Sequence, residues 1–379
     1  MTITFYSNFL NHHQLYFCQE LIEIIGEGNF HFVATMPIAS EQLTMGYVNM
    51  NEIYPFVIKA YDNNDEYSYA LKLANDSDVV IIGAAPSSYI SERLNYNKLT
   101  FRFSERLFKN GTWHRFLPST YRSIYKSYLA FKQKSLYVLC ASAYLAEDLA
   151  LVGFPKAKCF KWGYFPKAKV YEESVINFKS SSNTIELLWV GRMIWWKHPE
   201  DAIYTLDYLL KSGIQCHLTM IGQGKKRKEV EKFALHLGIT EKVTFRDFCS
   251  EQEVRCCMER ANIYIFSSGR EEGWGAVLNE AMNSGCMVVA NRCAGSTPYL
   301  IQNKKNGLIY DGSRKELRKC LDIVIKDQSL ITTMGEEAYN TIVNTWNYRV
   351  AAHRFVKLSK SFINGQEQNG ISFGPCSYV

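Results

Sequence analysis

Short runs of apolar residues, rich in β-branched and aromatic types, alternate along the chain with longer stretches of helical periodicity. Such alternation is typical of parallel sheets whose faces are covered by helices. In the first half, the pattern predicts a helix at residues 15–25. The predicted strands lie at residues 3–6, 30–34, 79–82, 99–103 and 136–140 in the first half, and at 185–190, 217–221, 243–245, 263–266 and 287–290 in the second. An α/β fold is expected.

The segment 172–184 interrupts this alternation, because it is polar, serine-rich and without periodicity. Such a segment is typical of a linker, and 379 residues are more than one ordinary core accommodates. We therefore expect two doubly wound, Rossmann-like domains, at residues 1–168 and 182–346, which bind ligands at the carboxyl ends of their strands.

Composition narrows the cellular setting. Eleven cysteines without regular spacing, and no Cys-x-x-Cys, favour free thiols over a disulfide framework or a structural zinc site. The chain opens directly on a strand-like run, so no secretion signal is expected, and no apolar run approaches the length of a membrane span. A cytoplasmic location is therefore expected.

The most informative segment is 272–280, Glu-Gly-Trp-Gly-Ala-Val-Leu-Asn-Glu, in which two carboxylates lie eight positions apart. It follows the predicted strand 263–266. Gly273 and Gly275 allow backbone to approach a ligand, and a helix predicted to begin near Ala276 would point its free N–H groups at an anion. In the alternative interpretation, Glu272 complements the helix dipole and Glu280 is a solvated surface residue.

A second segment, 191–199, follows the predicted strand 185–190 and contains two cations, Arg192 and Lys197. Arginine offers a planar fork of donors and lysine a mobile point charge, a combination suited to binding a diphosphate. Alternatively, both are ordinary exposed cations.

Gly222 and Gly224 follow the predicted strand 217–221 and invite a dinucleotide interpretation. It fails, because Arg227 stands where Gly-x-Gly-x-x-Gly needs its third glycine. The basic run 225–228 is interpreted as a solvated helix face, and no nucleic acid partner is expected.

Together, 191–199 and 272–280 resemble the Gly-Arg-x4-Lys and Glu-x7-Glu motifs of retaining glycosyltransferases of the GT4 family, glycosyl transferases group 1. The resemblance covers about residues 185–360. It implies the GT-B fold, two Rossmann-like domains facing a central cleft, with a C-terminal helix at 347–365 that completes domain 1–168. The implied activity is retaining transfer of a sugar from a nucleotide diphosphate sugar to a glycan, for example in capsule, O-antigen or exopolysaccharide synthesis.

The resemblance also implies roles for individual residues. Arg192 and Lys197 would neutralise the leaving diphosphate, Glu280 would bind the ribose, and Glu272 would orient the donor sugar. No metal or other cofactor is expected. The implied donor-binding residues are Gly191, Gly222, Gly224, Gly273, Trp274, Gly275, Ala276, Val277 and Glu280. His198 and Asp247 replace family glycines, so the nucleobase is not implied.

The first half is expected to bind the acceptor. Asn11, His12 and His13 follow the first predicted strand, and their amide and imidazole groups can bond sugar hydroxyls. Alternatively, Asn11 caps the helix and the histidines are structural. Glu105 stands near a position where many family members carry a histidine that contacts the transferred sugar, and we expect Glu105 to act in its place as a catalytic residue. The alternative is a Glu105–Arg106 salt bridge.

Residues 107–134 interleave lysines and arginines with aromatic residues, and residues 107–146 contain no Asp or Glu. Cations are attracted to anionic leaflets and aromatics favour the membrane interface. We therefore expect peripheral contact with the inner face of the cell membrane and, by extension, a lipid-linked glycan acceptor. RNA binding and simple core packing are the competing interpretations.

Two other classes of function remain open from sequence. A hydrolysing nucleotide-sugar epimerase of the same fold would need no acceptor, and a catalytically silent GT-B protein would only bind.

Overall fold

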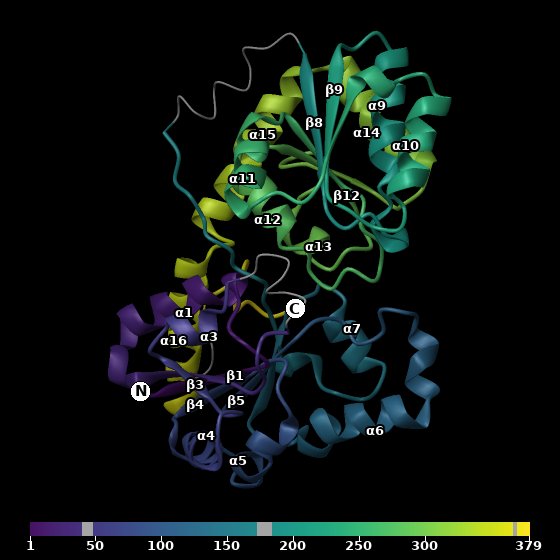
Figure 1. Ribbon diagram of the computed structural model, residues 1–379. Coiled ribbons are helices and arrows are strands. Elements are labelled where there is room, and N and C mark those ends of the chain that lie inside the picture. Colours follow the sequence, from purple (N-terminus) through teal and green to yellow (C-terminus); the bar gives the residue numbers. More distant parts are fainter. Residues whose placement is uncertain (40–47, 173–183, 367–369) are drawn as a thin grey trace. The chain divides into compact units, whose positions relative to one another are not determined.

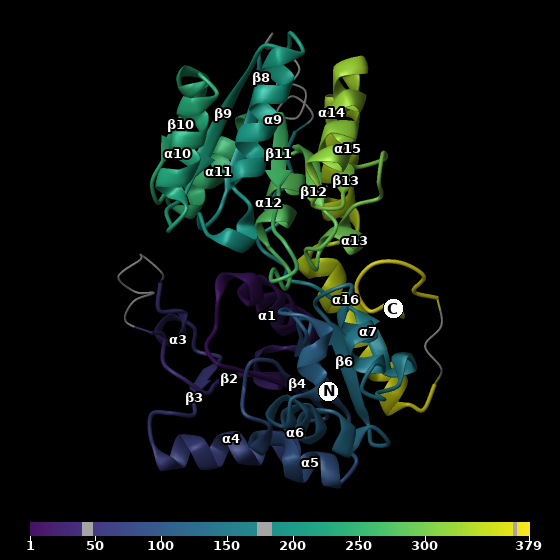
Figure 2. The same cartoon turned by 90° about the vertical axis from the view of Figure 1, so that its right-hand side faces the viewer.

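The computed structural model describes residues 1–39, 48–172, 184–366 and 370–379. The chain divides into two compact units (Figures 1 and 2). Unit 1 comprises Met1–Lys167 and Asn347–Val379, and unit 2 comprises Ala168–Trp346. Each unit contains one all-parallel sheet with helices on both faces, which confirms the expected pair of Rossmann-like domains. Most of the predicted linker 172–184 lies outside the described residues.

The sheet of unit 1 has seven strands in the order β3-β2-β1-β4-β5-β6-β7. The strands are β1 (Ile3–Ser7), β2 (Phe30–Ala34), β3 (Val57–Lys59), β4 (Val79–Ile82), β5 (Thr100–Ser104), β6 (Leu136–Cys140) and β7 (Cys159–Lys161). All five strands predicted in this half are present. The prediction missed β3 and β7, because three-residue edge strands are too short to give an apolar period.

Helices cover both faces of this sheet. On one face lie α1 (His12–Ile25) and α16 (Tyr348–Ile363), which pack through aromatic contacts such as Phe17–Phe355 and Phe101–Phe355. This confirms that the C-terminal helix returns to the first domain. The other face carries α4 (Asn64–Asp76), α5 (Ser91–Asn95), α6 (Pro118–Ser127) and α7 (Leu145–Ala150), with α3 (Met50–Ile53) beside β3.

Unit 2 has a six-stranded sheet in the order β10-β9-β8-β11-β12-β13. The strands are β8 (Ile185–Val190), β9 (Cys216–Ile221), β10 (Val243–Arg246), β11 (Ile263–Phe266), β12 (Met287–Asn291) and β13 (Leu308–Tyr310). Helices α9 (Glu200–Lys211), α10 (Arg227–His236) and α14 (Arg314–Lys326) cover one face. Helices α11 (Glu251–Arg260), α12 (Val277–Asn283) and α15 (Ser329–Asn344) cover the other, and α13 (Thr297–Leu300) precedes β13. All five predicted strands are confirmed here too.

Short 3-10 turns connect several elements. They are η1 (Glu27–Asn29), η2 (Ser87–Ile90), η3 (Thr112–Phe116), η4 (Leu129–Phe131), η5 (Lys156–Lys158), η7 (Trp195–Lys197) and η8 (Thr240–Lys242). Within the described ranges, no helix is both long enough and apolar enough to cross a bilayer.

Candidate functional site

The conspicuous loops of unit 2 all leave the same edge of its sheet. Because β8, β9 and β11 are parallel neighbours, their carboxyl ends lie together, and so do the loops that follow them. These loops are residues 191–199, 222–226 and 267–276. In open α/β sheets this edge is where ligands bind.

Lys197 and Glu272, 75 positions apart in sequence, form an ion pair at this edge. Both side chains are largely buried, with 14% and 16% exposed. The carbonyl of Lys197 also accepts a hydrogen bond from Ser267 Oγ at 2.6 Å, and Ser267 Oγ accepts one from Trp189 Nε1 at 2.9 Å. The basic and acidic motifs therefore meet in one fixed arrangement.

The glycines of this edge have a packing role. Gly222 has φ 132°, and a Cβ there would lie 2.0 Å from the carbonyl oxygen of Gly191. Gly224 has φ 152°, and its Cβ would lie 2.4 Å from the carbonyl oxygen of Met193. Only glycine lets the loop after β9 rest directly on the loop after β8. Gly222 and Gly224, which the sequence predicts to lie beside the donor, are therefore also required for the packing of these two loops.

Arg227, which takes the position of the missing third glycine, explains the failed dinucleotide pattern. Its Nη1 donates to the carbonyl of Gly222 at 2.9 Å, and its guanidinium lies 4.8 Å from the ring centroid of Phe245. The basic run continues with Lys226, which pairs with Glu200 at 3.2 Å. These two cations therefore serve local structure.

Glu280 is half-buried on α12, and burial raises the pKa of its carboxyl to about 7, although the nearby Arg255 guanidinium lowers it. The alternative interpretation, a freely solvated surface residue, is wrong on this point. No side chain or backbone group in the described ranges donates a hydrogen bond to its carboxylate. Its oxygens are thus available to hydroxyl donors of a ligand.

Trp274 departs from its expected role. Its side chain is fully buried, its Nε1 donates to Asn279 Oδ1 at 2.8 Å, and its ring packs against Trp346 and Tyr299. Only its backbone can reach a ligand. Gly275, the next residue, has φ 86°, and a Cβ there would lie 2.5 Å from the ring of Phe266.

Arg192 and His198 flank the lysine. Arg192 is exposed, with its guanidinium 5.8 Å from the ring centroid of Trp196. His198 adopts the left-handed conformation, φ 44° and ψ 53°, that the family glycine would favour. Its Nδ1 lies 3.4 Å from Glu200 Oε1, and this hydrogen bond raises the pKa of the imidazole despite partial burial.

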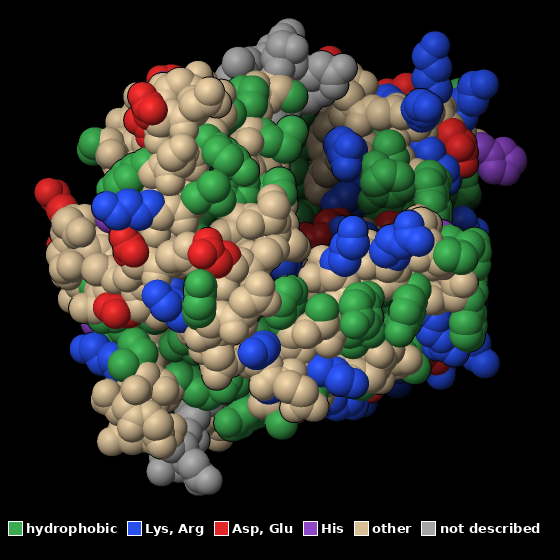
Figure 3. All heavy atoms as spheres, turned by 90° about the horizontal axis from the view of Figure 1, so that it is seen from below, with side chains coloured by type: hydrophobic (Ala, Val, Ile, Leu, Met, Phe, Trp, Pro, Cys, Tyr) green, Lys and Arg blue, Asp and Glu red, His purple; other side chains and the backbone are tan. Residues whose placement is uncertain are grey.

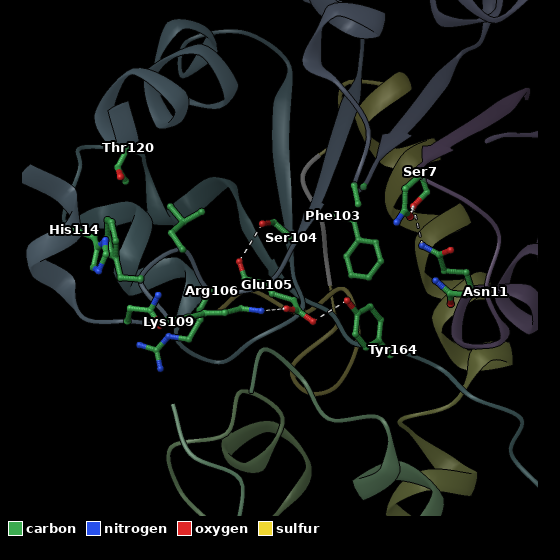
Figure 4. Close-up of a pocket in the computed structure, with 17 residues that line it drawn as sticks. Ser7, Asn11, Phe103, Ser104, Glu105, Arg106, Lys109, His114, Thr120 and Tyr164 are labelled. Carbon is green, nitrogen blue, oxygen red and sulfur yellow. Dashed lines mark hydrogen bonds and ion pairs between the residues drawn. The ribbon is translucent and has the colours of Figure 1, made fainter. Parts of the chain in front are cut away.

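Unit 1 contains a pocket of about 660 Å³ at the carboxyl ends of β1, β4 and β5 (Figure 4). Most of its lining residues carry hydroxyl, amide or charged groups. The lining residues are Ser7, Asn8, Asn11, Gln14, Gly83, Ala84, Phe103, Ser104, Glu105, Arg106, Leu107, Phe108, Lys109, Asn110, His114, Thr120 and Tyr164.

Glu105 lies in this pocket, where it accepts a hydrogen bond from Tyr164 OH at 2.8 Å and pairs with Lys109 (Figure 4). The alternative Glu105–Arg106 salt bridge is wrong. Arg106 instead lies over the ring of Tyr144, and its Nε is 3.7 Å from Asp148 Oδ2.

Asp148 holds the loop that carries Glu105. Its buried carboxylate accepts the backbone N–H groups of Leu107 at 3.0 Å and Phe108 at 3.1 Å. Asp148 lies on α7, so α7 holds in place the backbone of the loop that carries Glu105.

The expected acceptor residues are only partly brought together. Asn11 lines the pocket and also caps α1, its Oδ1 accepting His13 N–H at 3.0 Å. His12 and His13 do not line it, and the ring of His13 stacks at 5.6 Å behind Tyr164. Burial lowers the pKa of His13 well below its usual range.

Sequence reasoning missed Gln14 and Tyr164. Gln14 is buried, its Oε1 accepts no hydrogen bond within the described part of the chain, and its Nε2 lies 3.4 Å from Ser7 Oγ. A polar residue at a buried helix position was the available signal for Gln14. Tyr164 follows the unrecognised strand β7, so nothing marked it as lying at a strand end.

The described residues contain no cluster of three or more His, Cys, Asp or Glu side chains able to hold a metal ion.

Comparison with known proteins finds a family model that matches most of unit 2. Residues 172–341 match the family model described as Glycosyl transferases group 1. An uncharacterized glycosyltransferase of Methanocaldococcus jannaschii is 28% identical over 188 residues, which cover 48% of this chain and 46% of that protein. The chain thus spans about half the length of this relative.

Two further comparisons extend over more of the chain. The lipopolysaccharide core biosynthesis glycosyltransferase LpsE of Rhizobium meliloti is 20% identical over 238 residues, 62% of this chain and 68% of that protein. The crystal structure of Anabaena HepE in complex with UDP matches 95% of this chain and 100% of its own, with a TM-score of 0.69 and 15% identity. At that identity the likeness shows a shared fold.

Proposed function

We propose, from the match of residues 172–341 to glycosyl transferases group 1, that the chain transfers a glycosyl group from a nucleotide diphosphate sugar to a hydroxyl of a glycan. One observation carries the proposal. Lys197 and Glu272, from two motifs far apart in sequence, meet as a largely buried ion pair at the carboxyl edge of the unit 2 sheet.

The donor is assigned to this edge. Arg192 and Lys197 supply positive charge for the diphosphate as negative charge grows on the leaving group, a role that in other enzymes a metal ion fills. Glu280 accepts hydrogen bonds from the ribose hydroxyls with its unpartnered carboxylate. A nucleotide diphosphate donor agrees with the UDP complex of HepE, which shares this fold.

The transfer proceeds with retention of anomeric configuration. The acceptor oxygen attacks the anomeric carbon on the face that the phosphate leaves, the bond from that carbon to the phosphate oxygen breaks, and the acceptor proton passes to that oxygen. Glu272 is not the nucleophile in this scheme, because its carboxylate already pairs with Lys197. It orients the lysine and the donor sugar.

The acceptor is assigned to the pocket of unit 1. The hydroxyl, amide and carboxylate groups in its wall suit a molecule with many hydroxyls. The buried Gln14 Oε1, which accepts no hydrogen bond from the described residues, could accept one from such a hydroxyl. Glu105, held by Tyr164 and Lys109, is placed to bond the attacking hydroxyl. We propose a growing or lipid-linked polysaccharide as the acceptor, in line with the lipopolysaccharide role named for LpsE.

A thermal-shift panel of uridine, guanosine and adenosine diphosphates and their sugar conjugates tests the donor site. A ligand at 100 times its Kd stabilises by about 2.7 kcal/mol. One nucleotide series should stabilise the protein and lose its effect in Glu280→Ala. Stabilisation by none of them, with the protein folded, would contradict the donor assignment.

A turnover assay then separates the classes of function. Product that forms only when an acceptor glycan is present supports transfer. Conversion of the nucleotide sugar without any acceptor would indicate an epimerase instead, and nucleotide binding without any turnover would indicate a silent binding protein.

A further inference from the structure

The segment formed by η3 and α6 has two chemically different sides. Toward the interior, His114 and Thr120 line the unit 1 pocket and Ile124 is buried. Toward solvent stand Trp113 and Phe116, with 58% and 73% of their surface exposed. Two large apolar side chains that are this exposed and only three positions apart indicate a surface that binds another molecule or a membrane.

Helix α6 continues the pattern in two parallel rows. Tyr121 and Tyr125, one turn apart, form an exposed aromatic row with ring centroids 6.4 Å from each other. Arg122 and Lys126, also one turn apart, form an exposed basic row. At about 100° per residue, the basic row lies directly beside the aromatic row.

We name this outer side the α6 surface, and it comprises Trp113, Arg115, Phe116, Tyr121, Arg122, Tyr125, Lys126 and Lys132. In Figure 3, the right-hand part of the face on which α6 lies shows Lys and Arg side chains interspersed with hydrophobic ones.

Among the described residues, no acidic side chain forms a salt bridge with the cations of this surface. No Asp or Glu occurs between residues 107 and 146. None of the salt bridges between described residues involves Arg115, Arg122, Lys126 or Lys132. Lys109, on the pocket side, does pair with Glu105. The cation on the pocket side therefore has an acidic partner, and the cations on the solvent side can interact with another molecule.

We propose that the α6 surface docks on an anionic lipid bilayer. Adjacent aromatic and basic rows let the rings enter the headgroup region while the long cationic side chains remain at the charged surface. Each cation near an anionic leaflet adds attraction, and Trp and Tyr favour the interface. RNA bases can also stack on exposed aromatic rings, so RNA binding is one outcome of the test below. We favour the bilayer because side-by-side rows of rings and cations on one helix face fit a flat interface.

Docking would also serve the acceptor, a consequence that rests on the proposed function. Because His114 and Thr120 line the pocket from the same segment, lipid contact through its outer side would hold the pocket at the membrane. A glycan anchored in that membrane could then reach the pocket without leaving its lipid.

Vesicle flotation of the full chain tests the proposal. The protein should float with phosphatidylcholine vesicles that contain phosphatidylglycerol, should not float with phosphatidylcholine alone, and should release at high salt. Arg122→Glu with Lys126→Glu should weaken partitioning at least tenfold, and Phe116→Ser with Tyr121→Ser should weaken it comparably. The matched control, Lys315→Glu with Lys326→Glu on exposed positions of α14, should float as the parent does.

Several outcomes would overturn the proposal. They are no flotation with anionic vesicles, equal flotation with neutral vesicles, undiminished flotation of either α6 double variant, or a gel shift with RNA that these variants abolish while vesicles fail to bind. Thermal stabilisation by the nucleotide should be unchanged in both double variants. This readout separates failure of the docking proposal from failure of the donor site.

Discussion

The two units share one architecture but encode their chemistry differently. In unit 2, the edge to which we assign the donor is built from contiguous motifs that contact one another: Lys197 pairs with Glu272, and Gly222 packs on Gly191. In unit 1, the pocket is lined by one continuous run, residues 103–110, and by residues from distant parts of the chain, and Asp148 holds the backbone of that run. The candidate site of unit 2 thus consists of sequence motifs, and that of unit 1 is a pocket.

This difference follows from the ligands proposed for each unit. A nucleotide diphosphate always presents the same charged group, which demands fixed cations and close backbone. Acceptors differ in shape and hydroxyl pattern, and single substitutions around a polar pocket can follow them. Unit 2 should therefore be intolerant of change at its edge, and unit 1 should respond to change by altering its choice of acceptor.

The largest effect is expected from replacing Lys197, and it should differ from that of replacing Lys109, which also pairs with a glutamate. Lys197→Ala should lower kcat by about 100- to 1000-fold with every acceptor, because a cation is lost where charge develops in the transition state. Lys109→Ala also releases a glutamate, Glu105, but should change KM for the acceptor more than kcat. Steady-state kinetics with two acceptors would check this. Near-normal turnover of Lys197→Ala would contradict the donor-site assignment.

Next in size is the requirement for glycine at the loop contact. Gly222→Ala should lower the free energy of unfolding by about 3 kcal/mol, because its Cβ would overlap a backbone carbonyl that cannot move freely. Gly213→Ala is the matched control, since Gly213 has φ 82° but open space around its Cβ position, and it should cost only about 1 kcal/mol. Urea denaturation measures both. Equal losses would show that conformation alone, not the close contact, requires glycine at Gly222.

The sequence predicted the strands of both units and the positions of the two motifs in unit 2, and the reason is physical. Every predicted strand is present because buried parallel strands are continuous apolar runs. The two motifs of unit 2 could be located because each follows such a run, so their positions at one edge follow from topology. The sequence could not predict the ion pair between Lys197 and Glu272, because this pair depends on how two loops fold at the edge of the sheet.

Unit 1 shows where sequence patterns stop. Tyr164 follows a strand of three residues, too short to recognise, and Asp148 acts on a loop 40 positions away. Glu105, a predicted candidate, does line the pocket, but the sequence did not predict its partners Tyr164 and Lys109. Likewise the burial of Trp274, predicted from its motif to bind the donor, depends on the distant Trp346.

A moderate effect is expected where unit 2 keeps an unpartnered carboxyl. Burial raises the pKa of Glu280 to about 7 from 4.5, so the folded state binds more protons than the unfolded state between these values. Stability therefore falls as pH rises from 4.5 to 7. Glu280→Gln removes this cost and should stabilise the free protein by about 1–3 kcal/mol at pH 8, with little gain at pH 4.5.

The same variant should bind nucleotide less tightly, because a neutral amide is a weaker acceptor for ribose hydroxyls than a carboxylate. Thermal unfolding at the two pH values, with and without nucleotide, measures both effects. A gain that does not depend on pH, or unchanged nucleotide affinity, would contradict the role given to Glu280.

The smallest expected effect concerns the histidine that stands in place of a glycine. A left-handed conformation costs a non-glycine residue about 1 kcal/mol, and glycine's greater freedom in the unfolded chain offsets part of the relief. His198→Gly should therefore stabilise by about 0.5 kcal/mol at high pH. The hydrogen bond with Glu200 raises the pKa of His198, so its stabilising contribution is full below pH 6.5 and is lost as pH rises through the folded pKa.

The gain from His198→Gly should thus be larger at pH 9 than at pH 5.5. Lys304→Gly is the matched control in the same unit, because Lys304 has φ 67° and its side chain enters no salt bridge between described residues. Its gain should be the same at both pH values. If His198→Gly also shows no pH dependence, the Glu200 contact does not stabilise the loop, and the loop is held by its other contacts, such as the Lys197–Glu272 pair and the hydrogen bond from Ser267.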